Sequence, residues 1–359
     1  MQRAPTAWLF SARVDLSVFL GVALLSGALS LFAPRLGLSR ETPLLAWLLL
    51  VVCVDVAHVW ATLYRVYLDA AELRRRPLLY AAAPLLGYAG GVGLHSVSSA
   101  LFWRALAYVA VWHFVRQQAG WMALYARRAK DPEWLARLDA AAVYAATLGP
   151  VVWWHANLPR AFWWFVENDF VSGLPQVVGS LALVAHALVL LAWAGAHLYR
   201  ARKGERLHPG KAALLFSTWL VWFSGIVLAR DDFSFTVSNV LLHGVPYFAL
   251  LYRYAKGRSA EGGYRAAATL LRVGVPGFLS LLLVLAFVEE LAWDKLVWHE
   301  RAALFGAGGW SLGDGALALV VPLLALPQVT HYILDGFVWR GRENPELGRR
   351  LGWTAAPTA

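Results

Sequence analysis

The chain has 359 residues, of which 59% are hydrophobic and 15% charged, and its mean hydropathy is +0.54. A soluble domain carries about a quarter charged residues, so this composition excludes an ordinary soluble domain and predicts an all-α, polytopic membrane protein. The net charge of +10 could suggest a nucleic-acid partner. We expect no such partner, because the basic residues form short clusters between apolar runs, where signals for membrane orientation belong.

Apolar runs of about 20 residues recur along the chain and predict ten membrane-spanning helices in a single integral-membrane domain, residues 1–359. The loops between them are alternately rich and poor in Lys and Arg, which predicts that both termini lie in the cytoplasm. We expect a multi-pass protein of a bacterial inner membrane, with the lipid bilayer as its partner and a disordered tail after Trp339. The expected spans cover residues 14–33, 44–66, 77–94, 99–124, 137–155, 174–199, 211–229, 234–254, 268–290 and 315–339.

The second expected span carries a stripe of polar residues. Asp55, His58, Thr62, Arg65 and Asp69 are spaced by 3, 4, 3 and 4 residues, which places them on one face of a helix. An isolated ionisable group in hydrocarbon costs several kcal/mol, so this face must meet protein, water or a ligand. We expect Arg65 and Asp69 to be solvated at the inner membrane surface, and Asp55 and His58 to lie at membrane depth.

Four histidines lie on even-numbered expected spans, which all cross the membrane in the same direction. Each is followed by a basic residue at a similar spacing, so at about 1.5 Å rise per residue the four lie within about 10 Å of one another in depth. Each also has polar companions one helical turn away. The histidines are His58, His113, His243 and His331, and their companions include Asp55, Thr62, Arg116, Gln117, Asn239, Tyr247 and Asp335.

This set of side chains indicates a metal site. Imidazole with carboxylate is a ligand set for iron, zinc, manganese or copper, and the single cysteine, Cys53, excludes a Cys-based site. We expect a transition metal, with iron favoured, bound by the four histidines. Haem is less favoured because polar groups flank each histidine. Asp55 and Asp335 would be co-ligands or would orient ligands, and the other orienting groups would be Thr62, Gln117, Asn239 and Tyr247.

Three further residues have two interpretations each. Arg116 could hold an anionic headgroup or a carboxylate substrate and so act in catalysis, or it could extend to the polar boundary of the membrane. His186 has no polar companion, and we favour a hydrogen bond to a neighbouring helix over a metal-binding role. We favour the same structural explanation for His197, which lies at the inner end of its span.

The four signature stretches are DVAHVWATLYRVYLD, HFVRQQAGWMALY, NVLLHGVPYFALLYRY and HYILDGFVWR. A polytopic chain with histidines in its spans resembles, in architecture, the membrane lipid desaturases and hydroxylases and the Brp/Blh-type carotenoid dioxygenases. The resemblance implies iron and oxygen chemistry on a lipid. The chain has none of the HxxxH or HxxHH clusters of the desaturases, so no catalytic residue is transferred from these families.

Four functions remain open on this sequence. The first is a metal-dependent oxidoreductase that acts on an apolar, lipid-like or isoprenoid substrate taken from the bilayer. The second is a proton-coupled transporter with an Asp and His relay. The third is a haem protein with two axial histidines, and the fourth is a metal-independent lipid-modifying transferase that uses Arg65, Asp69 and Arg116.

Overall fold

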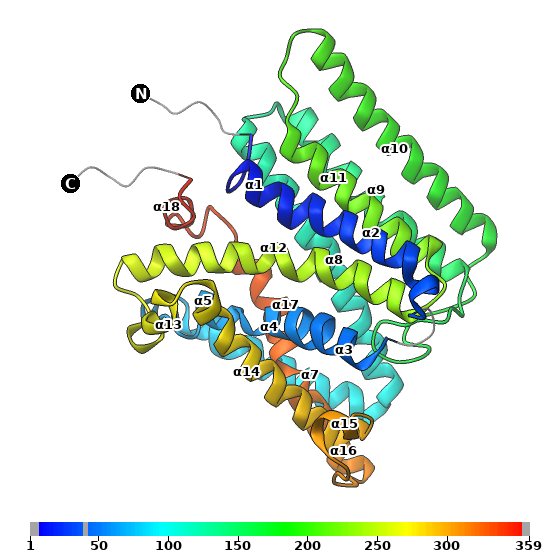
Figure 1. Cartoon of the computed structure of the whole chain (residues 1–359), viewed down its shortest axis with the longest axis vertical. Helices are drawn as coiled ribbons and strands as arrows, with labels where there is room; N and C mark the ends of the chain where they lie inside the picture. Colours follow the sequence, from blue (N-terminus) through cyan, green and yellow to red (C-terminus); the bar gives the residue numbers. More distant parts are fainter. Residues whose placement is uncertain (1–6, 39–41, 354–359) are drawn as a thin grey trace. The chain divides into compact units, whose positions relative to one another are not determined.

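The computed structural model describes residues 7–38 and 42–353, and in these residues every regular element is a helix. The described chain forms two compact units (Figure 1). One contains Met1–Ala46 and Ala107–Pro246, and the other contains Trp47–Leu106 and Tyr247–Ala359. We call them unit 1 and unit 2. Two long helices contribute to both units, namely α8 (Ser99–Ala129) and α12 (Asp232–Ala260).

Unit 1 is built around the antiparallel pair α9 and α10, which lie side by side (Figure 1). Gly149 allows this close approach, because a Cβ atom there would lie 2.8 Å from the Cβ of His186, and small residues let membrane helices pack closely. Helix α11 and segment η4 pack against α9, and η1 and α2 pack against α11. The elements of unit 1 are α1 (Ala12–Asp15), η1 (Leu16–Gly21), α2 (Val22–Phe32), η2 (Ala33–Leu36), α9 (Glu133–Ala156), α10 (Gln176–Arg202), α11 (Pro209–Trp222) and η4 (Phe223–Leu228).

A helix that runs from Leu44 to Arg65 in several segments enters unit 2 at Trp47. Its first segment is α3 (Leu44–Trp47), of which residues 44–46 belong to unit 1. The segment Leu48–Val56 is a π-helix, a form that is often found at functional sites, and it contains both Cys53 and Asp55. The other elements are η3 (Leu48–Val56), α4 (Ala57–Trp60), α5 (Thr62–Arg65), α6 (Ala70–Arg75), α7 (Pro77–Val97), η5 (Arg265–Ala267), α13 (Ala268–Arg272), α14 (Val275–Trp293), η6 (Asp294–Trp298), α15 (Ala302–Phe305), α16 (Asp314–Leu324), α17 (Leu326–Val338) and α18 (Leu347–Arg350).

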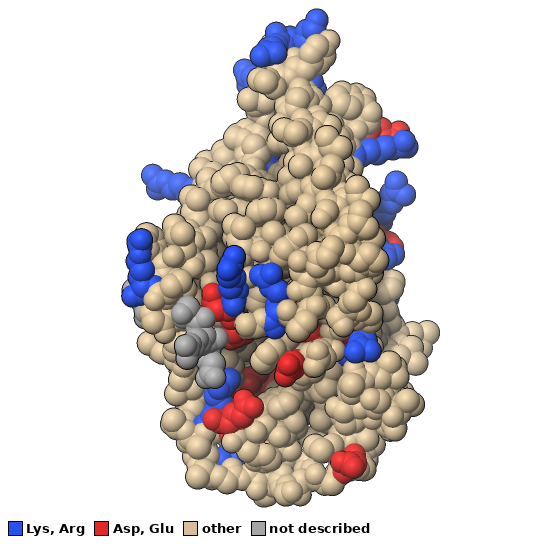
Figure 2. Space-filling model, turned by 90° about the vertical axis from the view of Figure 1, so that its right-hand side faces the viewer, with Lys and Arg blue, Asp and Glu red and all other residues tan. Residues whose placement is uncertain are grey.

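Eight helices among the described residues are long and apolar enough to cross a membrane, as in a multi-pass membrane protein. The pair α16 and α17 forms a ninth candidate that is bent by 41°. Helix α8 covers the expected span 99–124. It is not one of these candidates, because Arg104, His113 and Arg116 lower its hydropathy. Wide areas of the face drawn in Figure 2 carry no Lys, Arg, Asp or Glu side chain, which is consistent with contact with lipid.

The segment after Trp339 is ordered as far as Trp353, so the prediction of a disordered tail is wrong for residues 340–353. The segment contains helix α18 and buries Leu347 and Leu351. Arg253 donates a hydrogen bond from Nε to the carbonyl oxygen of Leu351 at 2.6 Å. The remainder of the predicted tail, residues 354–359, lies outside the described residues.

Candidate metal centre

Two of the four predicted histidines meet in unit 2. His58 on α4 and His331 on α17 are both buried, and their ring centres are 5.1 Å apart with the rings nearly perpendicular. One ring nitrogen of each lies within 4.8 Å of the other. Two nitrogen ligands of one metal ion are at most about 4.2 Å apart, which is twice the usual zinc–nitrogen distance. The two nitrogens are therefore close to, or already at, the separation that two ligands of one ion have.

The ring of His331 is held by a hydroxyl group on another helix. Oγ1 of Thr62 lies 2.8 Å from Nδ1 of His331. When Nδ1 carries the proton and donates it to this oxygen, Nε2 keeps its lone pair and is available as a ligand. The sequence spacing assigned Thr62 to His58 on the same helix, whereas the structure pairs it with the histidine of α17.

Each histidine of this pair also has the carboxylate that the spacing predicted. Oδ1 of Asp55 is 3.7 Å from Nδ1 of His58, and Oδ1 of Asp335 is 3.9 Å from Nδ1 of His331. The hydroxyl of Tyr247 donates to Oδ1 of Asp335 at 2.7 Å, and the Tyr247 ring is 5.8 Å from that of His58 and 5.2 Å from that of His331. Tyr247, predicted as a companion of His243, thus orients a carboxylate of unit 2.

The other two predicted histidines meet in unit 1. His113 on α8 and His243 on α12 are buried, and their ring centres are 5.2 Å apart. The ring of Phe114 stacks on His243 with a centroid distance of 3.5 Å and an interplanar angle of 6°. Gln117 donates to the backbone carbonyl of His243 at 3.3 Å, so it links the two helices through the backbone. Each unit therefore contains one close pair of these histidines.

Two predicted site residues have other partners in unit 1. The amide nitrogen of Asn239 donates to the carbonyl oxygen of Phe235 on its own helix at 2.8 Å. Arg116 lies on the exposed side of α8, where it donates to the hydroxyl of Tyr144 and lies over the ring of Trp112. This position favours the interpretation that Arg116 extends towards the polar boundary of the membrane.

The structural interpretation of His186 is confirmed, and the environment of His197 reveals a cluster that sequence reasoning missed. His186 lies 2.7 Å from the carbonyl oxygen of Ala145 on α9. His197 and Trp193 both approach Oδ1 of the buried Asp139, at 3.2 Å and 2.7 Å.

Lys211 completes that cluster. Its Nζ atom contacts the carboxylates of Asp139 and Asp131, and its side chain is buried. The sequence contained one indication of this cluster, namely that Asp139, His197 and Lys211 are ionisable residues near the ends of apolar runs. Nothing in the sequence indicated that they meet.

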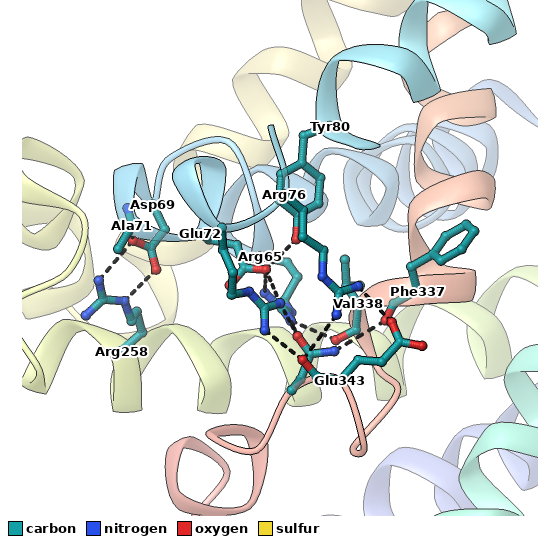
Figure 3. Close-up of polar contacts among 12 residues, drawn as sticks. Arg65, Asp69, Ala71, Glu72, Arg76, Tyr80, Arg258, Phe337, Val338 and Glu343 are labelled. Atoms are coloured by element: carbon teal, nitrogen blue, oxygen red, sulfur yellow. Dashed lines mark hydrogen bonds and ion pairs between the residues drawn. The ribbon is translucent and has the colours of Figure 1, made fainter. Parts of the chain in front are cut away.

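The prediction that Arg65 and Asp69 are solvated is wrong, because both are buried in an ionic network of unit 2 (Figure 3). Arg258 donates to Oδ1 of Asp69 at 2.9 Å, and Nη1 of Arg65 lies 3.2 Å from Oε1 of Glu72. Burial by itself raises the pKa of Asp69, but the hydrogen bond and charge of Arg258 outweigh this and hold that pKa below its usual value. The same balance holds for Glu72: burial raises its pKa, but Arg65, Tyr80 and Arg75 outweigh burial and hold that pKa below its usual value.

No family model, curated protein or solved structure matches the chain. Two pairs of buried imidazoles, one flanked by carboxylates, are suited to bind a transition-metal ion.

Proposed function

We propose that the protein is a membrane-embedded metal-dependent oxidoreductase and that His58 and His331 are two of the metal ligands. The observation that carries this proposal is the buried His58–His331 pair, with ring nitrogens within 4.8 Å and a carboxylate one turn away on each helix. Two histidines with one carboxylate are the ligand set of non-haem iron oxygenases, so iron is the favoured metal. Zinc, manganese and copper are the alternatives.

His113 and His243 would supply further ligands. This part of the proposal is supported by the similar depth that the sequence gives all four histidines and by the close approach of the His113 and His243 rings within unit 1, whose centres are 5.2 Å apart.

The protein groups would have separate tasks. A bound iron ion would supply redox chemistry with oxygen, and the chain would hold and orient it. Thr62 would fix the tautomer of His331, and Tyr247 and Trp339, which both donate to Asp335, would fix that carboxylate. The apolar helices would exclude water and admit a lipid or isoprenoid substrate from the bilayer. We infer ten spans with cytoplasmic termini in a bacterial inner membrane.

Metal analysis of the purified full chain tests the proposal. We expect one or two metal ions per chain, measured by inductively coupled plasma mass spectrometry. His58→Gln and His331→Gln should each reduce the content at least tenfold, because each removes a ligand while nearly keeping the side-chain volume. His186→Gln is the matched control, since His186 is a buried membrane histidine that bonds to a backbone carbonyl.

Metal-free wild-type protein, or full metal content in both ligand variants, would refute the metal centre. The absorption spectrum of the same sample identifies haem directly. A second candidate function is proton transport, favoured by the polar chain Thr62–His331 and Tyr247–Asp335 through unit 2. Proton flux by metal-free protein in proteoliposomes would support that function in place of the first.

A further inference from the structure

A charged cavity of about 210 Å³ lies in unit 2, where the end of α5 and helix α6 meet the segment after α17. Its walls include Arg65, Asp69, Glu72, Arg75 and Arg350. A cavity volume of about 10–15 Å³ is enough to hold one water molecule. The cavity in unit 2 therefore has room for a ligand of several heavy atoms. We call it the arginine pocket.

The arginines and carboxylates that line the arginine pocket are equal in number, and the network has one positive charge in excess when their ion-pair partners are counted as well. Each carboxylate on its wall already has an arginine partner: Asp69 pairs with Arg258, Glu72 with Arg75, and Glu346 with Arg349, while Arg350 pairs with Glu261. Arg65 then shares Glu72 with Arg75. Counted with these partners, the network contains five guanidinium groups, Arg65, Arg75, Arg258, Arg349 and Arg350, and four carboxylates, Asp69, Glu72, Glu261 and Glu346.

Arg65 is the deepest of these cations, with a side chain that is 1% exposed. Its guanidinium carbon lies 4.8 Å from the ring centre of Tyr254 and 5.5 Å from that of Trp339, which fixes the plane of the group. Nη2 donates to the carbonyl oxygen of Val338 at 2.7 Å. Among the described residues, Nε of Arg65 has no hydrogen-bond partner, and a buried donor without a partner costs about 1–3 kcal/mol.

A neutral group bridges two of the cations. Oδ1 of Asn344 accepts hydrogen bonds from both Arg65, at 3.0 Å, and Arg75. An oxygen held between two guanidinium groups is the position that a phosphate oxygen takes in arginine-rich sites, because the planar fork of N–H groups matches phosphate geometry. The amide supplies an oxygen there but no negative charge, so the excess positive charge remains.

We propose that the arginine pocket is a phosphate-binding site, filled either by the phosphate group of a phospholipid or by a soluble phosphate. Arg65 forms its floor and Arg350 its side. Arg75, whose side chain is 32% exposed, forms the entrance. None of the residues that line this site is a proposed metal ligand.

The experiment uses the purified full chain. Thermal unfolding in detergent with added sodium phosphate, against sodium chloride of equal ionic strength, detects binding of soluble phosphate. Native mass spectrometry after reconstitution in nanodiscs of phosphatidylglycerol detects a retained headgroup. We expect either a phosphate-dependent rise in the unfolding temperature or retained lipid, and each of Arg75→Gln and Arg350→Gln should weaken the response at least tenfold.

The matched control is Arg342→Gln, since Arg342 is an exposed arginine on the same C-terminal segment, and we expect the wild-type response from it. Metal content should be unchanged in all three variants, so failure of the metal centre and failure of this site are distinguishable. The proposal would be overturned if the wild type showed no response to phosphate and retained no phosphatidylglycerol. An equal loss in Arg342→Gln would also overturn it, because it would indicate attraction by surface charge alone.

Discussion

Thr62 connects two segments of unit 2 at the proposed metal centre. Its hydroxyl lies on α5, and its Oγ1 atom is 2.8 Å from Nδ1 of His331 on α17, a residue 269 positions away in the chain. A proton on Nδ1 that is donated to this oxygen leaves the lone pair on Nε2, the form of imidazole that binds a metal ion. The tautomer of His331 thus depends on a contact made by helix packing.

Substitution of this hydroxyl tests its role at the proposed metal centre. In Thr62→Val the side chain keeps its shape and loses the oxygen that fixes the tautomer of His331. Loss of such an outer partner typically reduces metal affinity by about 10–100-fold, and we expect a decrease of that size. Competition with a chelator of known affinity measures it.

Thr147→Val is the control for this substitution, because within the described part of the chain the Thr147 hydroxyl bonds only to carbonyl oxygens of its own helix, those of Val143 and Tyr144. Its metal affinity should equal that of the wild type. An unchanged affinity in Thr62→Val would show that the hydroxyl does not orient His331 for binding.

At the scale of helices, three elements of unit 1 are joined by one buried carboxylate. Asp139 on α9 accepts from Trp193 on α10 and from Lys211 at the start of α11, and His197 of α10 lies beside it. Asp139 and Lys211 have almost no exposed surface. A buried charge whose partner is removed is strongly destabilising, so the stability of this three-helix group depends on the pair.

We therefore expect Lys211→Met to lower the free energy of unfolding in detergent by about 3–5 kcal/mol, since it leaves the Asp139 carboxylate buried without its cation. Denaturant titration followed by tryptophan fluorescence measures the loss. The double variant Lys211→Met with Asp139→Leu should recover part of it, because the buried Asp139 charge is then removed and Asp131 keeps Arg200 at 3.6 Å.

Lys203→Met provides the comparison for an exposed lysine in the turn between α10 and α11, and its stability should change by less than about 0.5 kcal/mol. A loss below about 1 kcal/mol in Lys211→Met would mean that water reaches Asp139 and that the cluster does not join the helices.

At the scale of the whole chain, the number of crossings depends on α8. The eight apolar helices and the bent pair α16 and α17 together give nine crossings, which would place the two termini on opposite sides of the membrane. Helix α8 has 31 residues and so a length of about 46 Å, enough to span a bilayer. If α8 also crosses, there are ten crossings and the termini share one side.

Labelling of single cysteines decides between these counts. In a Cys53→Ser background we expect Arg13→Cys and Arg342→Cys to react alike with a membrane-impermeant maleimide, both protected in intact cells and both labelled after permeabilisation. Arg301→Cys, in a loop expected outside, should be labelled in intact cells. Opposite behaviour of residues 13 and 342 would contradict ten crossings and would exclude α8 as a span.

The all-helical fold could be predicted from the chain because apolar runs of about 20 residues permit few alternatives in a membrane. Sequence reasoning failed where charged residues are buried by distant segments. Arg65 and Asp69 were assigned to solvent because they follow an apolar run, yet their partners Asn344 and Arg258 come from the end of the chain and from α12. Contacts such as that of Asn344 with Arg65 also hold residues 340–353 in place, although the composition of this segment is typical of a free tail.

The single cysteine has a practical consequence for spectroscopy. Cys53 is half-buried in the π-helical segment, two residues before Asp55 and five before His58, and so lies within about 10 Å of the histidine along the helix. A nitroxide attached to this native thiol would relax faster beside a paramagnetic ion such as iron, manganese or copper. Its spectrum would be unaffected by zinc. The unmodified chain thus carries one attachment point from which electron paramagnetic resonance can distinguish the metals considered above.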